Sequence, residues 1–183
     1  MKKSAARKPK DNSSINFGEM VEGIDFPVFN ERAIRASAGL LFLFGFSGWM
    51  IAATLGVYQP LRAFGMAFMI DMFLRLFVGA KWVPSLILAN LVVRAQRPEW
   101  VDAEPKKLAW TIGFVMVTAS CMSMGLFALT GVLPLILCGV CLSFLFLESA
   151  FGICIGCEIA MRFSKTKPRL CPGDVCNYVP PKR

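Results

Sequence analysis

Four cysteines near the C-terminus are the residues best suited to chemistry in this sequence of 183 residues. Cys154 and Cys157 form a C-x2-C pair, and Cys171 and Cys176 follow in a segment that contains proline and glycine. Two thiols at an aqueous edge can exchange disulfides, carry a persulfide or bind a metal. The spacing of all four cysteines is near that of a zinc ribbon, so a zinc site built from them is a further hypothesis.

The expected surroundings of the Cys154 and Cys157 pair are mixed for an activated thiol. The pair falls near the C-terminal end of a long predicted helix, where the helix dipole is negative, and the neighbouring Glu158 adds negative charge. Both effects disfavour a thiolate. Basic residues that follow along the chain can offset them. In a reducing cytoplasm we expect no permanent disulfide at this pair.

Ionisable residues inside apolar segments form a second candidate site. Asp71 and Arg75 are four residues apart on one predicted helix, in the order that lets an acid and a base meet. Glu148 lies at a similar depth on another predicted helix. Because a charge inside a membrane is costly, it normally faces a partner or a cavity. We therefore expect Asp71, Arg75 and Glu148 to cluster, either as a proton or anion relay or as a contact that fixes helix register.

Three further cysteines lie in the middle of apolar segments. Cys138 and Cys141 form a second C-x2-C pair, and Cys121 lies within Cys-Met-Ser-Met. Buried cysteine commonly packs as a small hydrophobic residue. The alternative is a Cu(I) site that also uses Met122 or Met124, because soft thiolate and thioether ligands select Cu(I).

The composition excludes several classes of protein. Hydrophobic residues make up 56% of the chain and charged residues 17%, against about 45–50% and about 25% in soluble domains. These values argue against a soluble single-domain enzyme, a disordered chain and a small disulfide scaffold. The sequence contains no histidine, which excludes histidine-based catalysis and histidine-ligated metals.

The hydropathy pattern predicts an all-α, polytopic membrane protein. A membrane-spanning helix needs about 20 apolar residues, and four segments meet that need: residues 36–55, 63–80, 108–129 and 132–161. The last is longer than the hydrocarbon core, so its final turns should tilt or leave the bilayer. Residues 83–93 are too few to span and predict one interfacial or re-entrant helix.

Lysine and arginine gather before residue 36, in the connection 81–107 and after residue 161, whereas the other two connections contain only Arg62. The positive-inside rule then places both termini in the cytoplasm. The predicted organisation is a basic N-terminal segment (1–33), a four-helix membrane domain (34–162) and a cytoplasmic tail (163–183). Trp82, Trp100 and Trp110 fit an interfacial aromatic belt. The basic N-terminus fits contact with anionic lipid, so nucleic-acid binding is not needed to explain the charge.

The segment FGICIGCE at residues 151–158 resembles the signature F-G-x-C-x-G-C-E of a family of small bacterial membrane proteins known only as a domain of unknown function. Three upstream motifs resemble that family's landmarks in the same order: Asn30-Glu31-Arg32, Pro84-Ser85 and EPKKLA at residues 104–109. The resemblance covers about residues 25–161. It implies a four-helix domain in the bacterial inner membrane and a link to thiol or sulfur chemistry, and it implies no established reaction.

Three hypotheses for function follow, and whether the protein is an enzyme stays open. In the first, Cys154 and Cys157 relay electrons or sulfane sulfur with a thioredoxin-like or rhodanese-like sulfurtransferase partner, with Cys171 and Cys176 as a resolving pair. The second is a small transporter or metal-handling protein, assembled as a homo-oligomer through the small residues of Gly48-x-x-x-Ala52. The third is a structural subunit of a membrane complex with a cysteine-ligated zinc.

Overall fold

The structure is a computed structural model that describes residues 17–21, 26–125, 127 and 130–163. Cys171 and Cys176 lie outside the described residues, so the predicted four-cysteine zinc site and the resolving role of these two residues stay predictions. Within the described residues the protein is mostly helical, as the sequence predicted.

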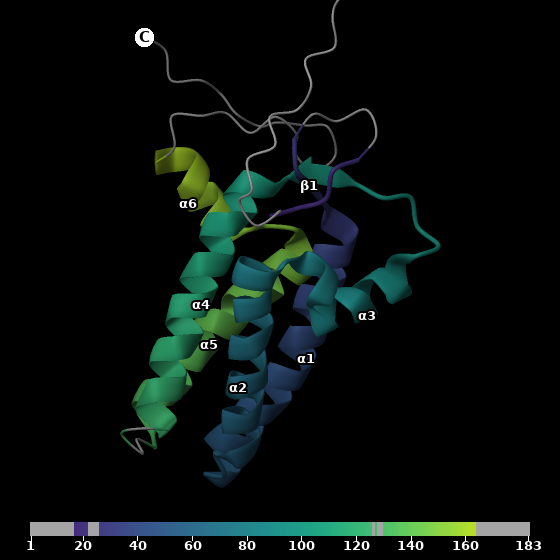
Figure 1. The fold of residues 1–183 in the computed structure, drawn as a ribbon. Helices are drawn as coiled ribbons and strands as arrows, with labels where there is room; N and C mark the ends of the chain where they lie inside the picture. Colours follow the sequence, from purple (N-terminus) through teal and green to yellow (C-terminus); the bar gives the residue numbers. More distant parts are fainter. Residues whose placement is uncertain (1–16, 22–25, 126, 128–129, 164–183) are drawn as a thin grey trace, which may run out of the picture.

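Four helices lie side by side in a bundle (Figure 1). Helix α1 covers Glu31–Leu55, α2 covers Gln59–Phe73, α4 covers Ala103–Gly125 and α5 covers Val132–Phe146. The α2 helix continues as a π-helix, η1, over Leu74–Val78, and α5 continues as the π-helix η3 over Leu147–Phe151. Helix α1 contacts both α2 and α5, and α4 contacts the same two helices from the other side.

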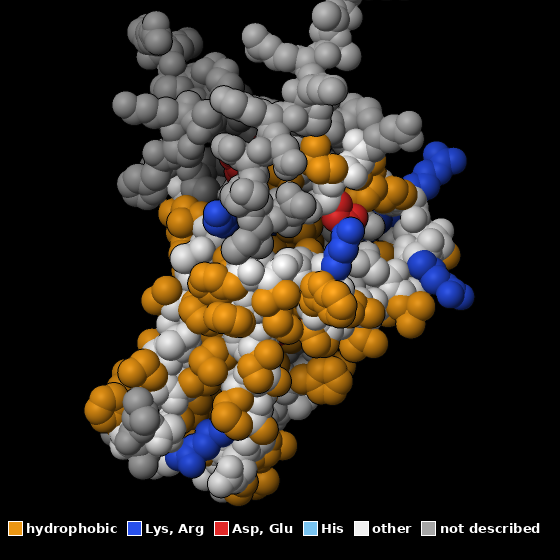
Figure 2. All heavy atoms as spheres, viewed as in Figure 1, with side chains coloured by type: hydrophobic (Ala, Val, Ile, Leu, Met, Phe, Trp, Pro, Cys, Tyr) orange, Lys and Arg blue, Asp and Glu red, His pale blue; other side chains and the backbone are white. Residues whose placement is uncertain are grey.

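Three of the described helical segments are long and apolar enough to cross a membrane: Glu31–Leu55, Ala103–Gly125 and Val132–Phe151. Figure 2 shows hydrophobic side chains over the sides of the bundle, with most of the visible charged side chains toward the end that carries β1 and α6. These features are compatible with a membrane protein. The fourth predicted span, residues 63–80, is divided between α2 and η1 and stays a prediction.

The short predicted helix is present as α3, Pro84–Val93, with proline in its first turn. It lies beside the bundle (Figure 1) and packs against α1. One side of α3 is buried, and exposed apolar side chains line the other: Ile87, Leu88, Leu91 and Val92. An apolar outer side is what an interfacial helix needs.

A two-stranded antiparallel sheet is the one element type that the all-α prediction omitted among the described residues. Strand β1, Val28–Asn30, pairs with β2, Trp100–Asp102, with Val28 opposite Asp102. Each strand has three residues, too few for an alternating pattern to stand out in the sequence. The sheet matters because α1 follows β1 and α4 follows β2 directly, so the first turns of these two helices are held together.

The last predicted helix, residues 132–161, is broken, which corrects the expectation of one continuous helix. Gly152 has a φ of 69° and ends η3 in the left-handed conformation, and α6 then covers Ile155–Phe163. Arg35 donates hydrogen bonds to the carbonyls of Ser149 and Ala150 near the break. Glycine adopts this conformation without steric cost, and a basic side chain satisfies the carbonyls at a helix end.

The predicted oligomerisation surface lies inside the chain. Gly48 and Ala52 are buried, and the backbone of Pro60 and Leu61 in α2 lies 3.3 Å from the position of a Cβ on Gly48. The small residues therefore allow α1 and α2 to approach within one chain, as small-xxx-small motifs do between helices. This pair is not free to contact a second copy.

Candidate functional site

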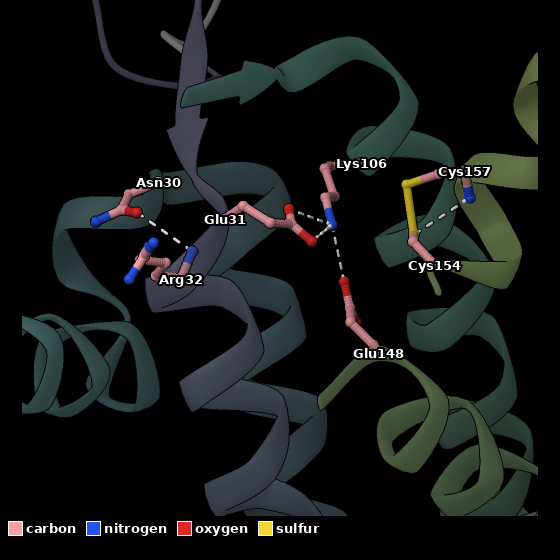
Figure 3. Close-up of polar contacts among 7 residues, drawn as sticks. All are labelled: Asn30, Glu31, Arg32, Lys106, Glu148, Cys154 and Cys157. Atoms are coloured by element: carbon pink, nitrogen blue, oxygen red, sulfur yellow. Dashed lines mark hydrogen bonds and ion pairs between the residues drawn. A yellow bond between two sulfur atoms is a disulfide. The ribbon is translucent and has the colours of Figure 1, made fainter. Parts of the chain in front are cut away.

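Cys154 and Cys157 form a disulfide at the start of α6 (Figure 3). The carbonyl of Cys154 accepts a hydrogen bond from the N–H of Glu158 at 2.9 Å, which is the first helical bond of α6. The Cys154 Sγ accepts the N–H of Cys157 at 3.3 Å. Cys154 therefore occupies the N-terminal capping position of α6, and both cysteines are half-buried.

This position reverses the electrostatics expected from the sequence. The pair was predicted near the negative C-terminal end of a helix, but the break at Gly152 places it at the positive N-terminal end of the next one. A helix N-terminus favours a thiolate, because its positive partial charge stabilises the negative sulfur. Glu158 is exposed and lies in the first turn of α6, where an acidic side chain also complements the dipole.

The α6 helix is fixed to the bundle through a glycine. A Cβ on Gly156 would lie 2.4 Å from the Cα of Ala109 in α4, so the two backbones are in direct contact. Only glycine permits this approach without displacement of one backbone. The disulfide is thereby held beside the first turns of α4, the helix that also carries Lys106.

Asp71 and Arg75 form the buried ion pair that their spacing predicted. Arg75 Nε lies 2.8 Å from Asp71 Oδ2, and the two side chains are 3% and 6% exposed. Arg75 Nη2 also donates to the hydroxyls of Ser37 and Ser85, and the Ser85 N–H donates to Asp71 Oδ1. The two opposite charges neutralise each other, and both side chains also form hydrogen bonds. These two conditions offset the desolvation cost of a buried ion pair.

Glu148 does not form an ion pair with Arg75, which corrects the predicted three-residue cluster. Its carboxylate lies 3.0 Å from Nζ of Lys106, and the same ammonium lies 2.9 Å from the carboxylate of Glu31 (Figure 3). Lys106 was expected in a cytoplasmic connection, but α4 begins at Ala103 and carries it into the bundle. Glu31 and Lys106 each belong to a motif that resembles one of the family's landmarks. This resemblance was the signal in the sequence that could have pointed to these two residues.

The bonds around Asn30 explain how Glu31 is placed. The Asn30 side chain caps α1 by accepting the N–H of Arg32 at 3.2 Å, and it accepts the N–H of Glu99 at the same distance. The Glu31 N–H donates to the carbonyl of Glu99 at 2.8 Å. One short sequence therefore caps α1, ties it to the segment before β2 and directs Glu31 toward Lys106 (Figure 3).

A cavity of about 70 Å³ lies next to the disulfide and joins the two ion clusters. Arg75, Glu148, Trp110 and Cys154 all line it, together with apolar side chains. Trp110 was predicted in an interfacial belt, but it is only 4% exposed, and the Arg75 guanidinium lies 5.0 Å from its ring centroid. Trp82, in contrast, is 70% exposed.

The three cysteines in the bundle are separate thiols. Cys138 Sγ lies 3.0 Å from the Ser120 hydroxyl, and Cys121, Cys138 and Cys141 are free and partly buried. Met124 is buried, whereas Met122 is 45% exposed. Among the residues that the structure describes, no group of three or more Cys, Asp or Glu side chains is placed to hold a metal. The Cu(I) site stays a prediction.

The fold and site define a helical protein with membrane-length helices and a C-x2-C disulfide at a helix N-terminus. Residues 29–165 match a family described as a domain of unknown function, DUF4395, and the chain belongs to that family. No curated protein and no solved structure shows significant similarity to the chain. The family resemblance inferred from the sequence is thus confirmed.

Proposed function

We propose that the protein is a membrane thiol protein whose Cys154 and Cys157 alternate between a disulfide and two thiols. The observation that carries the proposal is the disulfide at the capping position of α6. A helix N-terminus stabilises the thiolate that thiol–disulfide exchange requires. The half-buried pair can meet a soluble partner, and we propose a thioredoxin-like or sulfurtransferase protein in that role.

The proposed location is the bacterial inner membrane, with four spans and both termini in the cytoplasm. Three membrane-length helices support this topology. The fourth span is α2 with its continuation η1, which together run without interruption from Gln59 to Val78. Asp71 and Arg75 do not oppose this placement, because each neutralises the other inside the bundle. The disulfide then faces the cytoplasm.

The exchange needs no metal and no further oxidant. A thiolate of the partner attacks one sulfur of the pair, a mixed disulfide forms, and the other cysteine leaves as a thiolate. The second thiol of the partner then attacks the mixed disulfide. Two electrons pass from the partner dithiol to Cys154 and Cys157, and the partner becomes the disulfide. The reverse direction follows the same steps.

The test is to trap the mixed disulfide with the detergent-purified protein. The probe is a thioredoxin that lacks its resolving cysteine, and the chain carries Cys171→Ser and Cys176→Ser so that only the described cysteines report. We expect one covalent complex per chain, lost in Cys154→Ser/Cys157→Ser and retained in Cys141→Ser. Equal trapping in all variants, or none in any, would overturn the proposal.

A bound metal is a distinct outcome of the same preparation. If the full chain with all seven cysteines carries one zinc that Cys154→Ser removes, the pair is a metal ligand and the relay proposal fails. We expect the metal content to be unchanged by that substitution.

A further inference from the structure

Two residues that line the cavity beside the disulfide carry N–H donors for which the described part of the chain supplies no acceptor. Trp110 lines it, is 4% exposed, and among the described residues its Nε1 has no acceptor. Arg75 lines it too, and its bonds to Asp71, Ser37 and Ser85 use only Nε and Nη2. A guanidinium carries five N–H donors. A buried donor without an acceptor costs free energy, so a ligand with acceptor atoms fits here.

The size of the cavity limits the ligand. Its volume is about 70 Å³, whereas an engineered cavity that binds benzene measures about 150 Å³. An aromatic or quinone ring is therefore too large. A group of a few heavy atoms fits, and in so small a space it contacts the polar and apolar walls together.

The lining also determines which sulfur such a ligand would meet. Cys154 is among the lining residues, and Cys157 is not. A nucleophile in the cavity therefore reaches the Cys154 sulfur, with Cys157 as the leaving group. Cys157 lies in the first turn of α6, where the positive end of the helix favours its departure as a thiolate.

Charged groups around the cavity set a second condition. Arg75 is balanced by Asp71, whereas Lys106 faces the two carboxylates of Glu31 and Glu148. Of these five groups, Arg75 and Glu148 line the cavity. An anion is thus attracted by Arg75 and opposed by Glu148, and this opposition gives the site a testable signature.

We propose that the cavity binds a small sulfur oxyanion of the sulfite type, which attacks the disulfide at Cys154 from inside the protein. The proposal rests on the proposed thiol function and names a substrate class for the same site. Sulfite combines a nucleophilic sulfur with oxygens that accept hydrogen bonds from Trp110 and Arg75.

The reaction balances without another reactant. The sulfite sulfur uses its lone pair to form a bond to Cys154 Sγ, and the bond between Cys154 and Cys157 breaks. The bonding electron pair leaves with Cys157 as a thiolate, which takes a proton from water. The products are an S-sulfonate on Cys154 and a free thiol on Cys157. The sulfite sulfur is oxidised, and the disulfide is reduced.

The experiment follows the S-sulfonate by intact mass in the detergent-purified protein as sulfite concentration rises. We expect a rate that saturates with sulfite and one S-sulfonate per chain, mapped to Cys154 by peptide analysis. Trp110→Phe keeps a ring and removes the N–H, so the second-order rate constant should fall about tenfold, or about 1.4 kcal/mol. Trp49→Phe is the matched control, because its Nε1 donates to the Leu135 carbonyl outside this cavity; its rate constant should stay within twofold.

Two further measurements distinguish a loss of anion binding from a loss of folded structure. Glu148→Gln removes the opposing charge, so its rate constant with sulfite should rise about tenfold, which a merely structural defect would not produce. Hydrosulfide, which has no oxygens, should lose less than twofold in Trp110→Phe. Circular dichroism and the unreacted disulfide mass check that each variant is folded.

The outcomes distinguish this inference from the proposed function. A rate linear in sulfite, unchanged in Trp110→Phe, or an S-sulfonate on Cys157 overturns the cavity proposal while thioredoxin trapping can still succeed. If thioredoxin trapping also fails, the thiol function itself is wrong. A slower reaction in Glu148→Gln contradicts the proposed charge opposition and overturns the anion site.

Discussion

The chain contains two C-x2-C pairs, and they differ in the structure in both their bonding and their position relative to a helix start. Cys138 and Cys141 lie within α5 as free thiols, and Cys138 contacts the Ser120 hydroxyl. Cys154 and Cys157 lie across the start of α6 and form a disulfide. The spacing is the same, so spacing alone does not decide whether a pair forms a disulfide. The two pairs differ in their position relative to a helix start, and a helix N-terminus supplies positive partial charge and unused N–H groups.

Two ion clusters surround the second pair and are also unlike one another. Asp71 and Arg75 form a local pair of opposite charges, four residues apart. Lys106 joins Glu31 from α1 and Glu148 from η3, so it connects three distant segments. The first cluster stabilises one helix and its contact with Ser85. The second holds the first turn of η3, and the chain turns toward Cys154 after that helix.

Replacement of Lys106 should have the largest effect on stability. Lys106→Met leaves the buried Glu31 carboxylate and the partly buried Glu148 carboxylate without a cation, which costs about 3–5 kcal/mol in the free energy of unfolding. The neighbouring Lys107→Met, at an exposed position, should change it by less than about 0.5 kcal/mol. Thermal unfolding in detergent compares the two. Equal stability of the two variants would show that the cluster does not hold this end of the bundle.

A smaller effect is expected where α6 meets α4. Gly156→Ala places a Cβ 2.4 Å from the Cα of Ala109, and overpacking of this kind costs about 1–3 kcal/mol. Gly113→Ala is the control, because its Cβ would lie 3.9 Å from the Met72 sulfur. We expect the fraction of chains with the Cys154–Cys157 disulfide, measured by alkylation and mass, to fall only in Gly156→Ala. A full disulfide in both variants would contradict the proposed role of the α4 contact.

The helix break should respond to a change at its glycine. Gly152→Ala imposes a left-handed conformation on a residue with a side chain, at a cost of about 1–2 kcal/mol in unfolding free energy. Gly125→Ala, in open space at the end of α4, should be neutral or slightly stabilising. Chemical unfolding in mixed micelles measures both. If Gly152→Ala were as stable as Gly125→Ala, the continuous helix predicted from the sequence would be the better description.

The smallest effect is expected at the pair inside α5. Cys138→Ser, at a residue that does not line the cavity beside the disulfide, should leave the disulfide, its exchange with thioredoxin and its reaction with sulfite within twofold of the parent values. Kinetics of thiol exchange followed by mass provide the measurement. A strong loss in Cys138→Ser would show that the two C-x2-C pairs are coupled and would contradict the difference proposed between them.

Local patterns predicted much of the fold and part of the site. The i, i+4 spacing of Asp71 and Arg75 predicted their ion pair, and the length of the apolar segments predicted the three membrane-length helices. The partner of Glu148 was missed because Lys106 was counted as a residue of a polar connection. A long side chain and a pair of three-residue strands bring Lys106 to Glu31 and Glu148, and such long-range contacts leave no periodic signal.

The Cys154 and Cys157 pair was predicted as a thiol site, but its disulfide and its environment were not. A single glycine inside an apolar run is compatible with a continuous helix, so Gly152 gave no clear stop signal. The break depends on Arg35, a residue over a hundred positions away that satisfies the carbonyls of Ser149 and Ala150. Trp110 was likewise predicted at the interface. Its contact with Arg75 joins α4 to η1, and a contact between two separate helices leaves no local sequence pattern.

The most direct test of the central claim is a redox titration of the Cys154–Cys157 pair. The protein with Cys171→Ser and Cys176→Ser is equilibrated in defined dithiothreitol buffers, alkylated and measured by intact mass. We expect a single two-electron transition in which two alkyl groups appear together, absent from Cys154→Ser/Cys157→Ser. A pair that takes up no alkyl groups at any potential, or two thiols at every potential, would contradict it.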